Sequence, residues 1–288
     1  FSVKVKNPLT TLLFYMIIVA DFQEERIKMK PHILYEDQDI IVCLKPAGIP
    51  TQTSRPGLPD MVSILKNHIY QNSAHKKQPY LAVIHRLDQP VEGLLVFAKT
   101  PAAAKELNRQ LQSFGFGKYY QAVLLGCPQT ADGILEDYLV KDGRTNTSRI
   151  CTEETPGAKV ARLSYHIAKT TAEFSLAEIH LDTGRHHQIR VQMAHLGCPI
   201  AGDRKYGPNQ TSFSQLQLFA CRLEFAHPKT KKHMEFTHAP VLRVFADETP
   251  ADHPVDNRIS IGNESASFSF DHDNEHPCFL DTTGSKVP

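Results

Sequence analysis

Apolar residues along the chain fall into short runs, and most of these runs have the period of a β-strand. Between residues 174 and 181, for example, Ala177, Ile179 and Leu181 alternate with Glu178 and His180, as expected for a strand with one buried face. Residues that favour turns separate the runs. The predicted strands cover residues 33–35, 40–44, 93–99, 117–126, 160–168 and 174–181, with 216–226 and 234–237 as a closing hairpin.

Other segments have helical spacing instead. Thr100 and Pro101 are a typical N-cap and first-turn pair, and Gly197 followed by Pro199 suits the end of a helix. Helices interleaved with strands and hairpins predict an α+β fold with a mixed, mainly antiparallel central sheet and flanking helices. The predicted helices cover residues 60–71, 101–114 and a short segment ending before Gly197.

The two ends of the chain differ in composition from its body. The apolar run at 9–20 is shorter than the roughly 20 residues that span a bilayer. We therefore expect residues 1–28 to be an N-terminal extension, with a displaced helix or an extra anchor as the alternative. Residues 247–288 are rich in Ser, Asn, Asp and Pro without periodicity, which predicts a disordered acidic tail. A single domain at 29–246 lies between them.

Composition restricts the function only loosely. The chain has 6 cysteines, all isolated, which argues against a disulfide framework and fits free thiols in a reducing cytoplasm. Residues 251–288 carry a net charge of −5, so the first 250 residues carry +6. A body of this charge can bind phosphates, although many proteins with other partners are equally basic.

The stretch IHRLDQPVEGLLVFAKT holds a carboxylate, Asp88, between two apolar runs. Arg86 lies two residues away, so on an extended backbone the two side chains share a side and the cation favours the ionised carboxylate. Such a carboxylate can act as a nucleophile or a general base. The alternative is a turn at LDQP with a surface salt bridge.

A second cluster occurs in GRHHQIRVQMAH, where arginines and histidines surround one short predicted helix. The spacing of its histidines matches no usual zinc motif, and the two arginines oppose a cation. The cluster suits an anion, either a phosphate backbone or a buried carboxylate, with a basic helix face as the alternative. In GKYYQAV, Lys118 and Tyr120 share one face of a strand, where core packing is the simplest role for the tyrosine.

Together these segments resemble the RluA-type family of RNA pseudouridine synthases. That family has HRLD followed by a Gly-Leu-Leu strand, K-x-Y in another strand, and GR-x-HQIR continuing to G-x-P-x-x-GD-x-x-YG. The matching residues here are 85–88 with 93–95, 118–120, 184–190 and 197–207. The resemblance extends over about residues 32–240. It implies the pseudouridine synthase fold, with a central catalytic cleft, over the domain at 29–246.

The resemblance also implies roles for individual residues. Asp88 would contact the target uridine covalently, at C6 of the base or at C1′ of the sugar. Arg190 would pair with Asp88, Tyr120 would stack on the base and act on the C5 proton, and Arg86 would fill the space left by the flipped nucleotide. The residues expected to bind substrate are His85, Arg86, Lys118, Arg185, His187, Gln188 and Ile189.

The same resemblance implies an RNA substrate, ribosomal or transfer RNA, and a cytoplasmic enzyme that acts as a monomer without metal, cofactor or membrane. Val91 and Glu92 depart from the Thr-Ser of most relatives, which leaves the substrate choice open. Two rival functions remain. One is a catalytically silent RNA-binding protein on this fold, and the other is a metal-dependent hydrolase that uses His186, His187 and His195.

Overall fold

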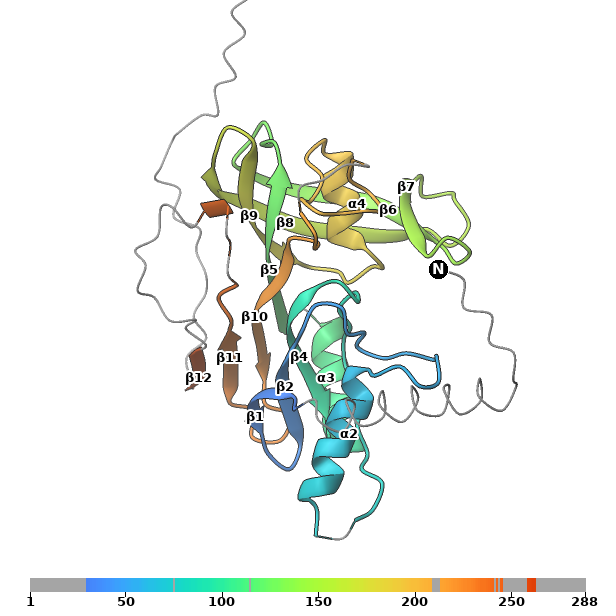
Figure 1. Ribbon diagram of the computed structural model, residues 1–288, viewed down its shortest axis with the longest axis vertical. Helices are drawn as coiled ribbons and strands as arrows, with labels where there is room; N and C mark the ends of the chain where they lie inside the picture. The colour runs from blue at the N-terminus through green and yellow to red at the C-terminus, as the bar shows by residue number, and fades with distance from the viewer. Residues whose placement is uncertain are drawn as a thin grey trace, which may run out of the picture. The chain divides into compact units, whose positions relative to one another are not determined.

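The computed structural model describes residues 30–74, 76–113, 115–208, 213–240, 242, 244–245 and 258–262. They belong to two compact units (Figure 1). The first unit runs to Ser113 and includes His227–Lys231, and the second contains the rest of the chain from Phe114 onwards. The predicted extension at 1–28 lies outside the described residues, as does most of the predicted tail. The single domain predicted at 29–246 thus corresponds to two compact units.

The first unit is a small antiparallel sheet with two helices. Strand β2 pairs with β1 and with β4, and β4 also pairs with β3. The four residues Ile40–Cys43 of β2 are fully buried, so this strand supplies the centre of the core. Helix α3 contacts β3 and β4. The elements are β1 (His32–Glu36), β2 (Ile40–Lys45), α2 (Met61–Asn72), β3 (Ala82–Val83), β4 (Glu92–Ala98) and α3 (Pro101–Gln112).

Both helices of this unit begin where the sequence predicts. Asp60 is the N-cap of α2 and accepts a hydrogen bond from the Ser63 N–H, while the Ser63 hydroxyl is close to the backbone of Asp60. This reciprocal arrangement is a capping box. Thr100 caps α3 by accepting from the Ala103 N–H, and Pro101 occupies the first turn.

The second unit is a larger antiparallel sheet with one helix. The strand order is β12-β11-β10-β5-β9-β8-β6-β7. Helix α4 lies beside β6 and β7 (Figure 1), where Val191 packs with Leu139 and Ala161. The elements are β5 (Phe116–Leu125), β6 (Asp132–Asp142), β7 (Thr147–Cys151), β8 (Lys159–Thr170), β9 (Phe174–Leu181), α4 (Gln188–His195), β10 (Leu218–Ala226), β11 (His233–Thr237) and β12 (Arg258–Gly262).

Three strands of the second unit have no counterpart in the sequence prediction. Strands β6 and β7 fall in a polar stretch, and of their residues only Leu139 and Ser148 are fully buried, so the apolar alternation is weak. Strand β12 lies within the predicted tail, so these five residues are ordered by pairing with β11 instead of being disordered. The α+β class with a mainly antiparallel sheet and flanking helices is confirmed. No helix of the described residues is both long and apolar enough to cross a bilayer.

Candidate active site

Hydrogen bonds hold the loop that carries Asp88 on both sides of this residue. On one side, the Thr51 hydroxyl donates to the Leu87 carbonyl and accepts from the Leu87 N–H, at 3.1 Å in both cases. On the other side, Gln89 accepts from the Gly48 N–H at 2.9 Å, and its amide donates to the Gly48 carbonyl at 2.9 Å. Asp88 itself is half-buried. Because both neighbours are held, the backbone that carries this carboxylate has little freedom.

A buried lysine also holds the loop that carries Asp88. Lys45 is fully buried, and its ammonium donates to the carbonyls of Pro46 at 2.9 Å, Ile49 at 2.7 Å and Gln89 at 3.1 Å. Burial lowers the pKa of Lys45 to about 8, and the negative charge of Asp88 opposes this shift. Lys45 is therefore largely protonated at neutral pH. The Lys45 ammonium and the Asp88 carboxylate are close enough to interact electrostatically.

The two predicted residues beside Asp88 differ in their surroundings. Arg86 is exposed, as expected of a side chain that meets RNA. His85 is half-buried, and its Nε2 accepts from the Val96 N–H of β4 at 3.4 Å. His85 thus helps to attach the loop to β4, a contact that does not depend on substrate.

On β5, Lys118 and Tyr120 share the buried face of the strand, with 8% and 7% of their surfaces exposed. Burial lowers the pKa of Lys118 to about 8, an effect that the Asp182 carboxylate opposes and the Arg185 guanidinium reinforces. A buried amine with a reduced preference for the charged state can exchange a proton near neutral pH. Tyr120 is part of the core of the second unit, and its catalytic role stays a prediction.

Several predicted substrate-binding residues at the start of α4 are engaged within the protein. Gln188 is 3% exposed, and its amide oxygen accepts from the Thr183 hydroxyl and the Arg185 N–H at 2.7 and 2.9 Å. Its amide nitrogen donates to the Arg162 carbonyl of β8 at 3.1 Å. Ile189 is 4% exposed. Gln188 and Ile189 therefore hold the helix start in place.

The remaining two residues of this group are placed differently. His187 is 7% exposed and occupies the left-handed region with φ 55°, which explains why α4 begins one residue later. Its Nδ1 is 2.7 Å from the Tyr206 hydroxyl. Arg185 is exposed and its Nε donates to the Val160 carbonyl at 2.7 Å.

Arg190 is buried, and the structure gives it a carboxylate partner that the sequence did not suggest. Its Nε and Nη2 donate to the two oxygens of Asp203, each at 2.7 Å. Asp203 is 2% exposed and Arg190 5%. Asp88 belongs to the first unit and Arg190 to the second, so the pairing of these two residues stays a prediction.

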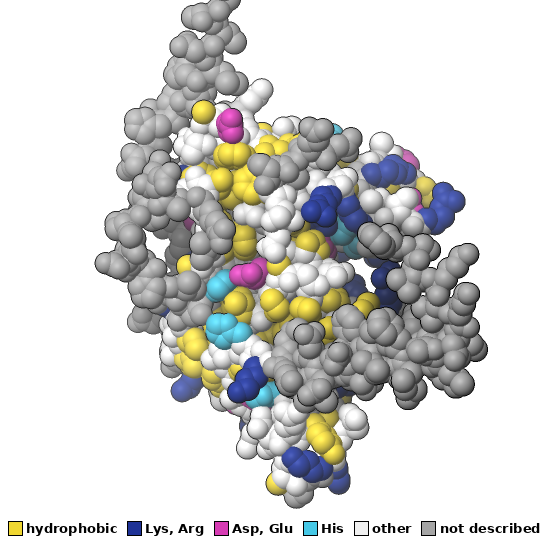
Figure 2. All heavy atoms as spheres, viewed as in Figure 1, with side chains coloured by type: hydrophobic (Ala, Val, Ile, Leu, Met, Phe, Trp, Pro, Cys, Tyr) yellow, Lys and Arg dark blue, Asp and Glu magenta, His cyan; other side chains and the backbone are white. Residues whose placement is uncertain are grey.

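The second unit also carries an exposed basic surface. Figure 2 shows Lys and Arg side chains, in dark blue, over the region where Figure 1 labels α4, β6 and β7. The Lys205 ammonium donates to the Asn146 carbonyl at 2.6 Å, which joins the turn after α4 to the β6–β7 hairpin. We call this the hairpin surface, and its exposed cations are Lys141, Arg144, Arg149, Arg204 and Lys205.

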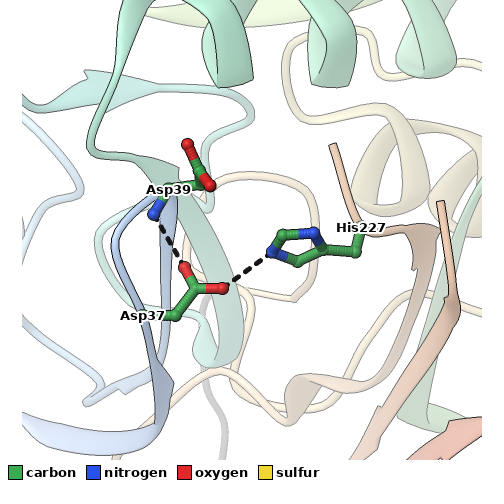
Figure 3. Close-up of side chains that lie close together, drawn as sticks. All are labelled: Asp37, Asp39 and His227. Carbon is green, nitrogen blue, oxygen red and sulfur yellow. Dashed lines mark hydrogen bonds and ion pairs between the residues drawn. The ribbon is translucent and has the colours of Figure 1, made fainter. Parts of the chain in front are cut away.

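Among the described residues, one group brings potential metal ligands together, and it lies in the first unit (Figure 3). Asp37 Oδ2 is 2.8 Å from His227 Nε2, and Asp37 Oδ1 accepts from the Asp39 N–H at 2.8 Å. His227 Nδ1 accepts from the N–H groups of Lys229 and Thr230 at 3.3 and 3.1 Å. Because both ring nitrogens already have protein partners, this group is better suited to fixing two turns than to binding a cation.

The histidines of the rival hydrolase hypothesis do not form such a group in the described part of the chain. His186 Nδ1 is 2.9 Å from the Ser148 hydroxyl and its Nε2 is 3.2 Å from Asn146 Oδ1. The His186 and His187 rings stack with their centroids 3.8 Å apart. They are parts of a structural network around the hairpin.

Sequence reasoning missed two buried charged residues, Lys45 in the first unit and Asp203 in the second. Lys45 ends an otherwise apolar strand, IIVCLK, and a lysine in that position was a detectable signal of a buried, paired charge. Asp203 stands in the GD of a matched motif, but nothing in the local pattern indicates that it binds Arg190, 13 positions earlier.

Comparison with known proteins is consistent with this arrangement. A family model described as RNA pseudouridylate synthase matches residues 39–195. A Bacillus subtilis protein named uncharacterized RNA pseudouridine synthase YlyB is 35% identical over 217 residues, which cover 75% of this chain and 70% of the relative. Ribosomal large subunit pseudouridine synthase D of Vibrio cholerae is 34% identical over 224 residues, covering 73% of this chain and 67% of the relative.

Among solved structures, human RNA pseudouridylate synthase domain containing 4 has a TM-score of 0.61 at 22% identity, covering 80% of this chain and 93% of the human one. Human RNA pseudouridylate synthase domain containing 1 has a TM-score of 0.58, also at 22% identity, covering 73% and 83%. At this identity the likeness shows the fold. The family model and the two relatives of 34–35% identity show that the chain belongs to the RluA-type family of RNA pseudouridine synthases and is an isomerase.

Proposed function

We propose that the chain converts uridine to pseudouridine in structured RNA, with Asp88 as the nucleophile acting on a base flipped out of its stack. The observation that carries the proposal is the fastening of the Asp88 loop through Leu87 and Gln89. A half-buried carboxylate on a restrained backbone, next to a buried ammonium, is pre-organised for attack on a bound substrate. A carboxylate in an ordinary surface turn would not need these supports.

The reaction is an isomerisation and needs no oxidant, reductant or metal. The carboxylate of Asp88 forms a bond to C6 of the uracil or to C1′ of the ribose, and the N1–C1′ bond breaks. The uracil rotates, C5 bonds to C1′, the C5 proton is lost and N1 gains a proton. If Asp88 attacked C6, its bond to C6 then breaks; if it attacked C1′, C5 displaces Asp88 as the C5–C1′ bond forms. In both cases the carboxylate is restored. Tyr120 is the residue that we propose to stack on the base and to act on the C5 proton.

Charged residues complete the proposal. Arg190 would face Asp88 and keep it ionised, and the exposed Arg86 would replace the flipped nucleotide within the RNA. The hairpin surface supplies further cations for the phosphate backbone. We also propose that the protein acts as a monomer in the cytoplasm and that its substrate is ribosomal or transfer RNA. The Vibrio cholerae relative is named for the large ribosomal subunit, so large-subunit RNA is the first substrate to test.

The decisive experiment compares the wild type with Asp88→Asn on transcripts of large-subunit ribosomal RNA and of transfer RNA. Pseudouridine is mapped through its carbodiimide adducts, which survive alkaline treatment that removes those of uridine, and RNA affinity is measured in parallel. We expect Asp88→Asn to lose activity by about 10³-fold or more while RNA affinity changes little. Equal product from both proteins would refute the nucleophile, and equal binding with no product from either would favour the silent RNA-binding protein.

A further inference from the structure

The guanidinium of Arg190 is held in one orientation by Asp203. Two parallel bonds of 2.7 Å join Nε and Nη2 to the two carboxylate oxygens, and both side chains are almost fully buried. A bidentate pair of this kind sets the plane of the guanidinium as well as its position. A guanidinium has five N–H donors, and the bonds to Asp203 use one at Nε and one at Nη2.

Asp203 is itself fixed by the turn that contains it. Its Oδ1 also accepts from the N–H groups of Lys205 at 2.9 Å and Tyr206 at 3.2 Å. Burial alone would raise the pKa of Asp203, but the Arg190 guanidinium and these N–H groups outweigh burial and lower it. Asp203 is therefore ionised at neutral pH, and Arg190 and Asp203 together carry no net charge.

Tyr206 extends this support to the β6–β7 hairpin. Its ring centroid lies 5.1 Å from Cζ of Arg190, a cation–π distance. Its hydroxyl accepts from the Ser148 N–H of β7 at 2.7 Å and is 2.7 Å from His187 Nδ1. Since Ser148 donates to the hydroxyl oxygen, the hydroxyl proton is available to His187. One side chain thus joins the start of α4, the turn after it and the hairpin.

We propose that Asp203 and Tyr206 are positioning residues that aim Arg190 at the reacting carboxylate. This inference rests on the proposed function, in which Arg190 acts on Asp88. With Asp203 balancing its charge, Arg190 acts as a directed hydrogen-bond donor, and its orientation matters more than its charge alone. Asp203 acts through Arg190 and is not assigned a contact with RNA.

The test compares Asp203→Asn and Asp203→Glu with the wild type on the RNA that the wild type modifies. Asp203→Asn keeps the size of the side chain but loses the ionic bidentate contact, so we expect kcat to fall by roughly 10–100-fold. KM and RNA affinity should stay within about threefold, because no RNA contact is removed. Asp203→Glu keeps the charge and should restore part of kcat. A kcat within about threefold of the wild type for folded Asp203→Asn overturns the inference, as does an equal loss of kcat and RNA affinity.

A matched control comes from the same helix. Gln192 of α4 donates to the Asp137 carboxylate at 2.7 Å, so Asp137→Asn removes a carboxylate contact to α4 that does not involve Arg190. Its kcat should stay within about threefold of the wild type, and a loss as large as that of Asp203→Asn would indicate general damage to the helix and overturn the inference.

Two further variants keep the outcome unambiguous. If Asp203→Asn fails to fold, Tyr206→Phe tests the same idea, because it keeps the ring beside Arg190 and loses the bonds to Ser148 and His187. We expect a loss in kcat of about tenfold with KM unchanged, and an unchanged kcat overturns the inference. Asp88→Asn distinguishes a failure of the proposed function from a failure of the positioning role. Retained activity in that variant refutes the proposed function, whereas loss of activity there with normal kcat in Asp203→Asn refutes the positioning role alone.

Discussion

Among the described glycines of the second unit, Gly202 is the one where an added Cβ would come closest to another atom. Its φ is +76°, in the region that residues with a Cβ rarely adopt. A Cβ added there would lie 2.0 Å from the Gln215 carbonyl oxygen and 3.1 Å from Phe213 Cβ. Gly202 also immediately precedes Asp203, so the backbone at this point determines where that carboxylate sits. We predict that Gly202→Ala is strongly destabilising.

Two free-energy costs set the expected destabilisation of Gly202→Ala, and a control variant isolates the first of them. The left-handed conformation costs about 1–2 kcal/mol for a residue with a Cβ. The overlap with the Gln215 carbonyl forces a backbone shift, for which overpacking typically costs about 1–3 kcal/mol more. Gly197 isolates the first cost, because its φ is +88° and no atom lies within 4 Å of an added Cβ. Gly197→Ala should therefore lose only about 1–2 kcal/mol.

Thermal unfolding followed by circular dichroism, with urea unfolding as a second measure, distinguishes the two variants. A difference of about 1–3 kcal/mol corresponds to a gap in Tm of roughly 2–4 °C for each kcal/mol in a domain of 150–250 residues. Gly202→Ala should be the less stable protein in both measurements. Equal Tm values for the two variants would refute the reasoning, since the clash at Gln215 would then have no energetic effect.

The remaining predictions concern two buried lysines, Lys45 and Lys118. Lys45→Met removes the donor for the carbonyls of Pro46, Ile49 and Gln89 and the cation near Asp88. We expect pseudouridine formation to slow by about tenfold or more with RNA affinity unchanged, and a rate within about twofold of the wild type would contradict the role of Lys45 in holding the loop. For Lys118, burial lowers the pKa to about 8. Above pH 8 the unfolded chain therefore binds more protons than the folded chain, and the free energy of unfolding should rise by about 1 kcal/mol between pH 8 and 9 through this residue. Urea unfolding at the two pH values should show a smaller rise in Lys118→Met than in the wild type, and identical pH dependence in the two proteins would refute the assignment.

Periodicity in the sequence was sufficient for most of the elements. Alternation predicted β5, β8, β9 and the β10–β11 hairpin, and capping residues placed the start of α3. These signals succeed because they depend on neighbours within a few positions, where the backbone period alone decides which side chains share a face. The HRLD, K-x-Y and HQIR segments identified the family for a similar reason, since each is a local pattern that can be read directly.

The partners of the charged residues were decided only by the tertiary structure. Lys45 bonds to Gln89 across 44 positions, Arg190 to Asp203 across 13, and Ser148 to Tyr206 across 58. Strands β6 and β12 likewise form through pairing with strands elsewhere in the chain, in segments whose own patterns are weak or polar. The sequence by itself determined the family and most of the elements, and the residues that it assigns to the chemistry stay a prediction. The fold decided which partner each buried polar or charged group meets. Burying such a group is costly unless a partner lies within bonding distance. Local spacing in the sequence does not encode that distance.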